Sequence, residues 1–217
     1  MLHIKTGDDM NIHEEITTYD VSRETMRRLE EFVALLQVWN NKMNLVSRNS
    51  LSEVWLRHIL DSVQLIKYIN QDTRNLVDIG SGAGFPGIVI AILGKEKMPA
   101  MKINLVESIA KKTMYLKDIC VNLDLDNVEI FNKRVEDTVF KGVDVITARA
   151  VSSLDKLLEY SYIIAGKETK MIFPKGITYD AELTEARRNW NFDCVTHKNM
   201  YHEDGVVLEI SKLGKKK

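Results

Sequence analysis

The sequence predicts an α/β fold in which helices cover a mostly parallel sheet. Short apolar runs alternate with helical periodicity from residue 75 onward, a pattern typical of parallel strands joined by helices. A glycine-rich turn directly follows the first apolar run, which is where such folds bind ligands. The last two apolar runs follow one another without a helix between them, so we expect one of these two strands to be antiparallel.

Length and composition agree with one globular unit. The chain has 217 residues, 45% of them hydrophobic and 28% charged, which is enough for a sizeable core. No apolar run reaches the roughly 18 residues of a membrane span, and residues 1–15 lack the basic and apolar regions of a signal peptide. We therefore expect a cytoplasmic protein without a membrane partner, in which Cys120 and Cys194 are reduced thiols and no metal is bound.

The net charge of −1 indicates no particular partner, but the charge is unevenly distributed. Residues 1–20 carry one lysine and five acids, a local charge of −4, so the remainder carries +3 and ends in a basic tail. Nucleic-acid enzymes are often more basic than this. Charge alone therefore gives only weak support for a nucleic-acid partner.

The first third of the chain should be helical. Residues 23–46 and 51–69 carry apolar side chains at helical spacing, and Ser50 or Ser52 is placed to cap the second helix. From residue 71 the pattern changes, so we divide the chain into a helical extension, 1–70, packed on a Rossmann-like unit, 71–217. Seven strands are expected, at 75–80, 102–108, 127–132, 142–149, 169–176, 194–198 and 206–210, with helices between them at 86–93, 109–123, 153–165 and 179–190.

The stretch LVDIGSGAGFPGIVIAIL, which begins at Leu76, places a glycine-rich turn between the first strand and its helix. Gly82, Gly84 and Gly87 match the dinucleotide-binding pattern G-x-G-x-x-G. Glycines let the backbone approach a ligand closely, and the helix N-terminus offers free N–H groups. Glu107 ends the next strand, where a carboxylate can accept two hydrogen bonds from ribose hydroxyls. This arrangement predicts an adenosine-containing ligand, either a dinucleotide or S-adenosylmethionine.

Three features favour S-adenosylmethionine. Asp78 precedes Gly80, which gives the D-x-G-x-G-x-G form typical of class I S-adenosylmethionine-dependent methyltransferases. The expected antiparallel hairpin at the end of the sheet is also typical of them, and no second catalytic domain follows, as many dehydrogenases would require. The competing hypotheses are an NAD-dependent oxidoreductase and a cofactor-binding protein without catalysis, for example an RNA-binding regulator.

Six stretches in order carry a more specific resemblance: WNNKMNLVS, RHILDS, LVDIGSGAGFPGIVIAIL, VESIAKKTMYLKDI, ITARAVSSL and FPKG. Over roughly Glu30 to Gly176 the chain resembles the small-subunit ribosomal RNA methyltransferase G family, also called glucose-inhibited division protein B. The resemblance implies S-adenosylmethionine-dependent methylation of guanine N7 in a loop of 16S rRNA near the decoding centre. It implies 16S rRNA or a small ribosomal subunit precursor as the partner, and we expect a monomer. Ala148 is a departure, since many members have serine before the arginine.

The residues expected to contact the cofactor lie on the glycine turn and at the ends of later strands. They are Asp78, Gly80, Gly82, Gly84, Phe85, Glu107, Val135, Glu136 and Arg149. Asp78 should order the turn by accepting backbone N–H bonds, or reach the methionyl amine through water. Phe85 is equally compatible with a place in the core. The resemblance implies that Val135 and Glu136 contact the adenine and that Arg149 contacts the cofactor.

Candidate RNA contacts are basic or histidine side chains. They are Arg57, His58, Lys111, Lys112, Lys175, Arg187 and Arg188. The resemblance places Arg57 and His58 at the border of the RNA cleft. Elsewhere a solvated charge is the alternative, and for His58 a structural role on an amphipathic helix is as well supported as a contact.

Methylation of N7 needs no general base, because the N7 lone pair is unprotonated at neutral pH. Attack on the sulfonium methyl is an in-line displacement, so the task of the enzyme is positioning. Positive charge passes from sulfur to the guanine, and a cation stacked over N7 would oppose this. We therefore expect no acid–base residue, and assign Arg149 to positioning, at the cofactor carboxylate, at guanine O6 or at a phosphate.

Overall fold

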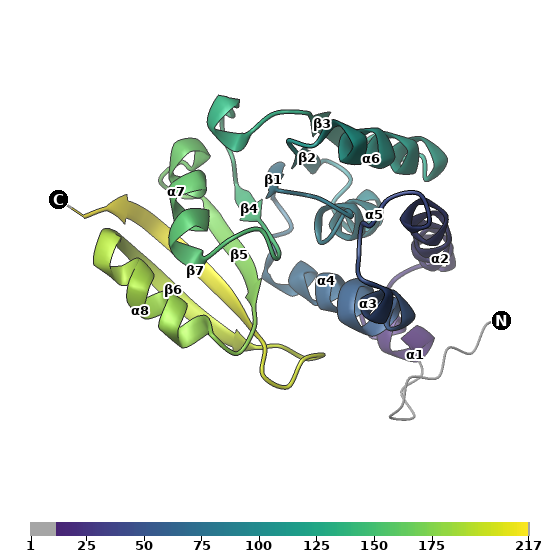
Figure 1. Cartoon of the computed structure of the whole chain (residues 1–217), viewed down its shortest axis with the longest axis horizontal. Coiled ribbons are helices and arrows are strands. Elements are labelled where there is room, and N and C mark those ends of the chain that lie inside the picture. Colours follow the sequence, from purple (N-terminus) through teal and green to yellow (C-terminus); the bar gives the residue numbers. More distant parts are fainter. Residues whose placement is uncertain (1–11, 217) are drawn as a thin grey trace.

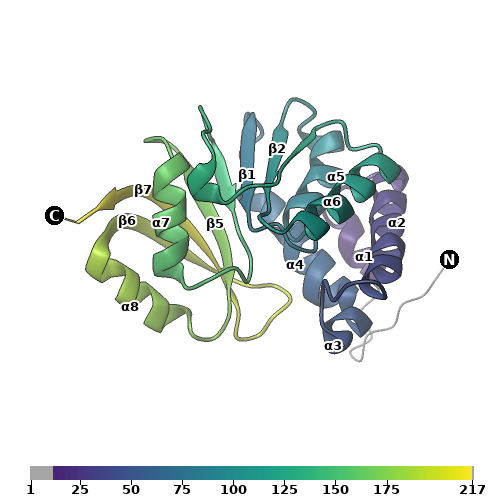
Figure 2. The same ribbon diagram turned by 45° about the horizontal axis from the view of Figure 1, so that its top comes forward.

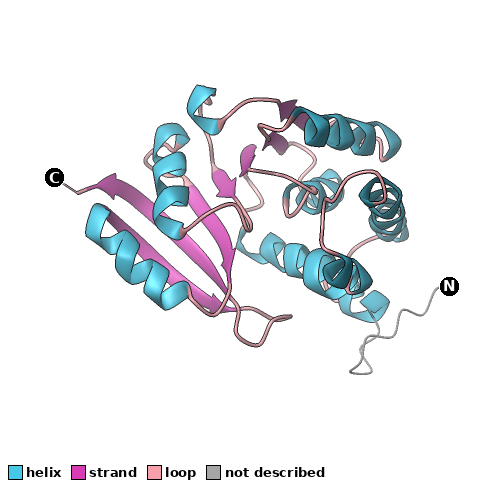
Figure 3. Ribbon diagram, viewed as in Figure 1, coloured by secondary structure: helices cyan, strands magenta, loops and turns pink. Residues whose placement is uncertain are grey.

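The structure, a computed structural model, describes residues 12–216. The acidic segment 1–20 and the predicted extension 1–70 are therefore described only from residue 12. Seven strands form one sheet in the order β3-β2-β1-β4-β5-β7-β6, with helices on both sides (Figure 1; Figure 3). The strands are β1 (Asn75–Ile79), β2 (Lys102–Val106), β3 (Val128–Phe131), β4 (Val145–Thr147), β5 (Lys170–Lys175), β6 (Trp190–Lys198) and β7 (Val206–Lys215).

Strands β1 to β5 are parallel to one another, and β7 lies between β5 and β6, antiparallel to both. The predicted mostly parallel, seven-stranded sheet with an antiparallel strand in its final hairpin is therefore confirmed. Because β1 lies inside the sheet, between β2 and β4, the turn that follows it lies at the carboxyl edge of the parallel strands, where α/β folds place their ligand clefts.

After residue 70 the helices lie within a few residues of their predicted spans, whereas before it there are more and shorter helices than predicted. The α-helices are α1 (Ile12–Thr17), α2 (Arg23–Asn40), α3 (Arg48–Ser52), α4 (Asp61–Val63), α5 (Gly87–Lys97), α6 (Ala110–Asn122), α7 (Leu154–Ile164) and α8 (Tyr179–Asn189). Among the described residues, no helix is both long enough and apolar enough to cross a membrane. Cys120 and Cys194 are free thiols.

Each face of the sheet is covered by its own set of helices. Leu76 points into a cluster with α5, α6 and the helices before β1, while Val77 points into a second cluster with α7 and α8. This alternation follows from the two-residue period of a strand. Figure 2 shows α7 and α8 beside β5, β6 and β7, and α5 and α6 beside β1 and β2, with α2 on the outer side of α5 and α6.

The segment predicted as one helix over 51–69 is a chain of short helices. A π-helical turn (Trp55–Leu60) lies between α3 and α4, and a 3₁₀ turn (Gln64–Tyr68) ends the segment. The predicted cap was wrong, since Ser47 caps α3 by accepting a hydrogen bond from the N–H of Ser50 at 3.2 Å. Ser47 is extended and therefore precedes the helix, whereas Ser50 and Ser52 are already helical.

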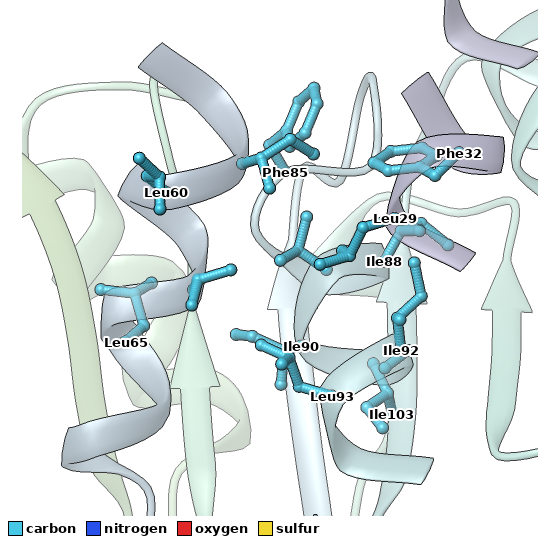
Figure 4. Close-up of a cluster of buried hydrophobic side chains, with 14 of the residues drawn as sticks. Leu29, Phe32, Leu60, Leu65, Phe85, Ile88, Ile90, Ile92, Leu93 and Ile103 are labelled. Atoms are coloured by element: carbon cyan, nitrogen blue, oxygen red, sulfur yellow. The ribbon is translucent and has the colours of Figure 1, made fainter. Parts of the chain in front are cut away.

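Helix α5 is buried on all sides because it lies between the sheet and the N-terminal helices. Its residues from Gly87 to Gly94 are all buried. In Figure 4, Leu29 and Phe32 of α2 and Leu60 of the π turn approach the α5 side chains, with Phe85 above them. The N-terminal helices and the glycine turn therefore share one core, so packing of the former supports the latter. The boundary at residue 70 between a helical extension and a core unit stays a prediction.

Three strands differ in length from their predicted spans by more than two residues. Strand β4 covers three residues, whereas β6 and β7 extend to Trp190 and Lys215. Strand β6 is at the sheet edge, and every second residue near its start faces solvent. Polar residues at those positions interrupt the apolar run, so the sequence pattern did not indicate the start of this strand.

Candidate functional site

The glycine turn adopts backbone angles that favour glycine. Gly80, Gly82 and Gly84 have φ values of +66°, +52° and +90°, a region that side chains disfavour. A Cβ on Gly80 would lie 2.7 Å from Val151 Cγ2, whereas a Cβ on Gly82 would meet nothing closer than the Gly80 carbonyl at 3.6 Å. The turn is therefore packed beneath Gly80 and Gly84 and open at Gly82.

Glu107 holds this turn from the end of β2. Its Oε2 accepts a hydrogen bond from the N–H of Gly82 at 3.0 Å, and its Oε1 accepts one from the N–H of Ile109 at 2.8 Å. The side chain is buried at 5% exposure. A carboxylate has about four acceptor positions, so both oxygens keep capacity for further donors such as ribose hydroxyls.

Asp78 lies beneath the turn and not in the cleft. Its side chain is fully buried, and Oδ1 accepts a hydrogen bond from the Thr147 hydroxyl at 2.7 Å. Burial raises the pKa of Asp78 to about 6, against the opposing effect of the Thr147 bond. A Cβ on Gly87 would lie 2.6 Å from Asp78 Oδ2. The expected acceptance of backbone N–H bonds by Asp78 stays a prediction, and the buried side chain offers no exposed atom for the alternative contact with the methionyl amine.

Two adjoining cavities lie along the carboxyl edge of the sheet. The first, which we call the loop cavity, has a volume of about 460 Å³, and the second, the strand-end cavity, about 110 Å³. Both are lined by Gly80, Glu107, Ser108 and Val151. Of the predicted cofactor residues, the loop cavity also holds Gly82, Phe85 and Arg149, and the strand-end cavity holds Val135 and Glu136. Asp78 and Gly84 line neither.

Arg149 is fixed at the end of β4 by groups from the N-terminal helices. Its Nη1 donates to the carbonyl of Arg57 at 2.9 Å and lies 3.3 Å from Asp61 Oδ2. The guanidinium also lies 5.0 Å from the centre of the Phe85 ring, within the range of a cation–π contact. Arg149 is thus held rigidly at the rim of the loop cavity.

Phe85 serves both of the roles that the sequence allowed. Its ring is 4% exposed and packs 5.3 Å from the Phe32 ring in the core. It also lines the loop cavity and stacks on His58 at 4.8 Å, with 21° between the rings. The π-helical turn brings His58 to this place, in agreement with the tendency of such turns to occur at functional sites.

His58 is neutral at physiological pH. Burial, and next the positive charge of Arg149, lower the pKa of His58 to about 3. Neither ring nitrogen has a hydrogen-bond partner among the described residues. His58 lines the loop cavity, but both ring nitrogens are buried, and a group with this pKa is a poor proton acceptor at pH 7.

The structure divides the predicted RNA contacts into two groups. His58 and Lys112 line the loop cavity, and Arg57 lies beside it, exposed and ion-paired with Glu53. In contrast, Arg187 and Arg188 are at the far end of α8: the first lies against Phe192 and the second pairs with Glu185 at 2.8 Å. Neither arginine lines the cavities at the glycine turn, so their RNA role stays a prediction without support from this geometry.

Lys175 is less available than the sequence suggested. Its Nζ lies 2.7 Å from Glu182 Oε2 and donates to the Ser152 carbonyl at 3.1 Å, with the side chain 9% exposed. A phosphate contact would require this pair to open. Lys111 is exposed on the first turn of α6.

A third cavity, which we call the outer cavity, adjoins the loop cavity and has a volume of about 580 Å³. Arg149 and Ala150 line both. Its other residues come from α4, the β4–α7 loop, the end of β5 and the loop after it, helix α8 and the β6–β7 loop: Asp61, Ser152, Pro174, Lys175, Gly176, Ile177, Glu182, Asn199, His202, Glu203, Asp204 and Gly205.

Sequence reasoning missed two parts of the site. Val151 packs on Gly80 and lines both smaller cavities, and the only signal for it was its place just after the β4 arginine. The second part is a buried network in which Asp61 Oδ1 accepts hydrogen bonds from Asn199 at 2.7 Å and Gln64 at 3.0 Å. Asn199 is 138 residues away from Asp61, so no local pattern could indicate the pair. Within 12–216, no cluster of three or more His, Cys, Asp or Glu side chains is arranged to hold a metal ion.

The strand order and the cleft together define a class I S-adenosylmethionine-dependent methyltransferase fold. Dinucleotide-binding sheets have the order 3-2-1-4-5-6, whereas here an antiparallel β7 is inserted between β5 and β6. The family model for rRNA small subunit methyltransferase G, GidB, matches residues 25–209. This chain belongs to the rRNA small subunit methyltransferase G family.

Curated relatives agree over nearly the whole chain. A ribosomal RNA small subunit methyltransferase G from Rickettsia bellii (strain OSU 85-389) is 39% identical over 196 residues, which cover 90% of this chain and 98% of the relative. A protein of the same name from Bartonella henselae is 41% identical over 195 residues, 89% of each chain. The crystal structure of a SAM-dependent methyltransferase from Aquifex aeolicus has a TM-score of 0.54 at 16% identity, covering 69% of this chain and 88% of that one. This last similarity concerns the fold alone.

Proposed function

We propose that this chain transfers the methyl group of S-adenosylmethionine to N7 of a guanine in a loop of 16S rRNA near the decoding centre. The observation that carries the proposal is the family match over residues 25–209, together with the candidate cofactor residues gathered around two adjoining cavities. The substrate is 16S rRNA or a small ribosomal subunit precursor, and the protein acts as a cytoplasmic monomer.

The cleft fits S-adenosylmethionine. The open position at Gly82 allows close approach to the backbone, and Glu107 keeps acceptor capacity for ribose hydroxyls beside it. Val135 and Glu136 line the strand-end cavity, where their backbone would meet the polar edge of an adenine. When bound, S-adenosylmethionine supplies an electrophilic methyl group.

The side chains around the loop cavity suit a nucleophile that has no proton to lose. Among its described lining residues, the titratable groups are His58, Glu107, Lys112 and Arg149. Both oxygens of Glu107 are bonded to backbone N–H groups, and His58 has a pKa near 3. This set is poorly suited to deprotonating an amine or a hydroxyl. Guanine N7 needs no base, and Arg149 positions the reactants.

The proposal is tested by mapping modified bases in 16S rRNA from cells with and without this gene. We expect one 7-methylguanine, in a loop near the decoding centre, to be lost with the gene. Purified protein should restore it on small subunits from the deleted strain. Methyl transfer to an exocyclic amine or a ribose would contradict N7 chemistry. Binding of S-adenosylmethionine without any transfer would favour the non-catalytic regulator.

A further inference from the structure

The outer cavity adjoins the loop cavity. The two share Arg149 and Ala150 at the end of β4. At about 580 Å³ the outer cavity is within the usual range of small-molecule sites. A ligand placed there lies beside the proposed cofactor and at the carboxyl edge of the sheet, where a methyl acceptor has to be.

The charges in the outer cavity do not suit a phosphate. Its two cations are already paired, Lys175 with Glu182 at 2.7 Å and Arg149 with Asp61 at 3.3 Å. Glu203 and Asp204 are exposed, and neither carboxylate forms an ion pair or hydrogen bond with another residue in the described part of the chain. The surplus charge is therefore negative, which repels the RNA backbone and attracts N–H donors.

The loop that carries these two acids is held in place. The Asn199 side chain accepts hydrogen bonds from the N–H groups of Tyr201 and His202 at 2.8 and 3.0 Å, and donates to buried Asp61 at 2.7 Å. Asp61 in turn contacts Arg149. The acidic wall and the arginine thus belong to one hydrogen-bonded unit, which pre-organises the cavity.

On this basis, and resting on the proposed function, we propose that the outer cavity receives the target guanine and that Glu203 and Asp204 read its Watson–Crick edge. Guanine presents two adjacent donors there, N1–H and the 2-amino group, which a carboxylate can accept together. Ile177, 72% exposed at the rim, offers an apolar surface for the face of a base that has left its stack. Adenine has neither the N1–H nor the 2-amino donor, so the two acids also discriminate against adenine.

The acids also stabilise the charge that the reaction creates. The bond between sulfur and methyl breaks, its electron pair stays on sulfur, and a bond forms between the methyl carbon and N7. The positive charge passes to the purine and no proton moves. Because the charge spreads over the ring, N1–H and the 2-amino group become stronger donors, so carboxylates at this edge bind the transition state more tightly than the substrate.

The first experiment compares two double variants of equal charge change. Glu203→Gln/Asp204→Asn removes the acidic wall, and Asp72→Asn/Glu168→Gln, two exposed acids outside the three cavities, is the control. With small subunits from the deleted strain and saturating S-adenosylmethionine, we expect the single-turnover rate to fall about 10- to 100-fold in the first variant and by less than about twofold in the control. Affinity for S-adenosylhomocysteine should be unchanged in both.

The outcomes separate this inference from the proposed function. If the unaltered protein does not methylate the subunits, the proposed function fails. If it does and the acidic double variant is as fast as the control, the inference is wrong. Equal losses in both variants would show a general charge effect and would also contradict it.

A binding measurement tests the inference without turnover. 7-Methylguanosine, guanosine, inosine and adenosine are added to the protein with S-adenosylhomocysteine, and the amide resonance of Gly205, which lines the outer cavity beside the two acids, is followed by NMR. We expect the largest shift for cationic 7-methylguanosine, a smaller one for guanosine, and less for inosine, which lacks the 2-amino group. No shift up to the solubility limit, or an equal response to adenosine, would overturn the proposal.

Discussion

Glu107 and Gly82 are joined by a hydrogen bond of 3.0 Å from the Gly82 N–H to Oε2 of the carboxylate. The bond links the end of β2 to the turn after β1 and fixes the open glycine next to an acceptor. Because the second oxygen is bonded to the Ile109 N–H, the carboxylate cannot rotate freely. The proposed ribose site is therefore oriented by the backbone before a ligand arrives.

Removing this carboxylate should weaken the cofactor and its product equally. We expect Glu107→Ala to reduce affinity for S-adenosylmethionine and S-adenosylhomocysteine about 10- to 100-fold, as for loss of hydrogen bonds to a charged group. The ribose is common to both ligands, so the contact is uniform binding. Calorimetry measures both affinities, with Glu129→Ala, an exposed residue of β3, as the control. A loss confined to turnover would contradict the ribose role.

The open side of the turn gives a matched pair of glycine variants. Gly82 and Gly142 have φ values of +52° and +62°, and a Cβ would meet nothing closer than 3.6 Å on the first and nothing within 4 Å on the second. Gly82→Val and Gly142→Val should each lower the free energy of unfolding by about 1–3 kcal/mol through backbone strain. Only Gly82→Val should abolish S-adenosylmethionine binding, because its side chain enters the loop cavity. Equal affinity in the two folded variants would remove Gly82 from the site.

Gly87 is required because a side chain would not fit at this position, and not because of its backbone angles. A Cβ there would lie 2.5 Å from Leu105 Cδ2 and 2.6 Å from Asp78 Oδ2, whereas at Gly94 the nearest atom is the terminal methyl of the unbranched Met101 side chain at 2.7 Å. We expect Gly87→Ala to lower the free energy of unfolding by about 1–3 kcal/mol or more, and Gly94→Ala on the same helix to be near neutral. Urea unfolding measures both. Similar losses of unfolding free energy in the two variants would show that the packing at Gly87 is not closer than that at Gly94.

Local sequence chemistry predicted the central part of this site. The positive φ angles at Gly80, Gly82 and Gly84, and the placement of Glu107 beside them, follow from a glycine turn between a strand and a helix. Parallel strands meet at one edge, so residues that end successive strands converge without further information. Arg149 ends the predicted fourth strand, and the resemblance added its contact with the cofactor.

The outer cavity could not be predicted in this way. Its walls join Asp61 to Asn199 and Lys175 to Glu182, and the first contact depends on β7 inserting between β5 and β6. That insertion brings the β6–β7 loop back beside the N-terminal helices. Contacts between residues so far apart in the sequence depend on the packing of the whole core. A different strand register would turn a different face of the strand towards that core.

The protonation of His58 gives a further prediction for stability. The folded-state pKa is about 3, against about 6.5 in an unfolded chain. Between these values the unfolded chain binds a proton that the folded protein does not, so the free energy of unfolding falls as the pH drops below about 6.5. Burial raises the pKa of Asp78 to about 6, so Asp78 acts in the opposite direction, and its stabilising effect at low pH is lost as the pH rises towards 6.

Comparing the protein with His58→Gln isolates the histidine, because Asp78 is present in both. Between about pH 7.5 and pH 5.5 the unaltered protein should lose up to about 1.4 kcal/mol more unfolding free energy than the variant, measured by urea titration at each pH. Equal losses would mean that His58 is not buried in its neutral form.

The same histidine should leave no step in the pH dependence of methyl transfer. A side chain that stays neutral down to about pH 3 does not change charge in the neutral range, and N7 has no proton to remove. We expect single-turnover rates from about pH 6 to 8.5, which brackets the ordinary histidine pKa, to have the same profile in the unaltered protein and in His58→Gln, whatever the difference in height. A step near pH 6.5 that disappears in His58→Gln would show that this histidine titrates during the reaction. The proposed base-free transfer would then be wrong even with the fold and the cofactor site correct.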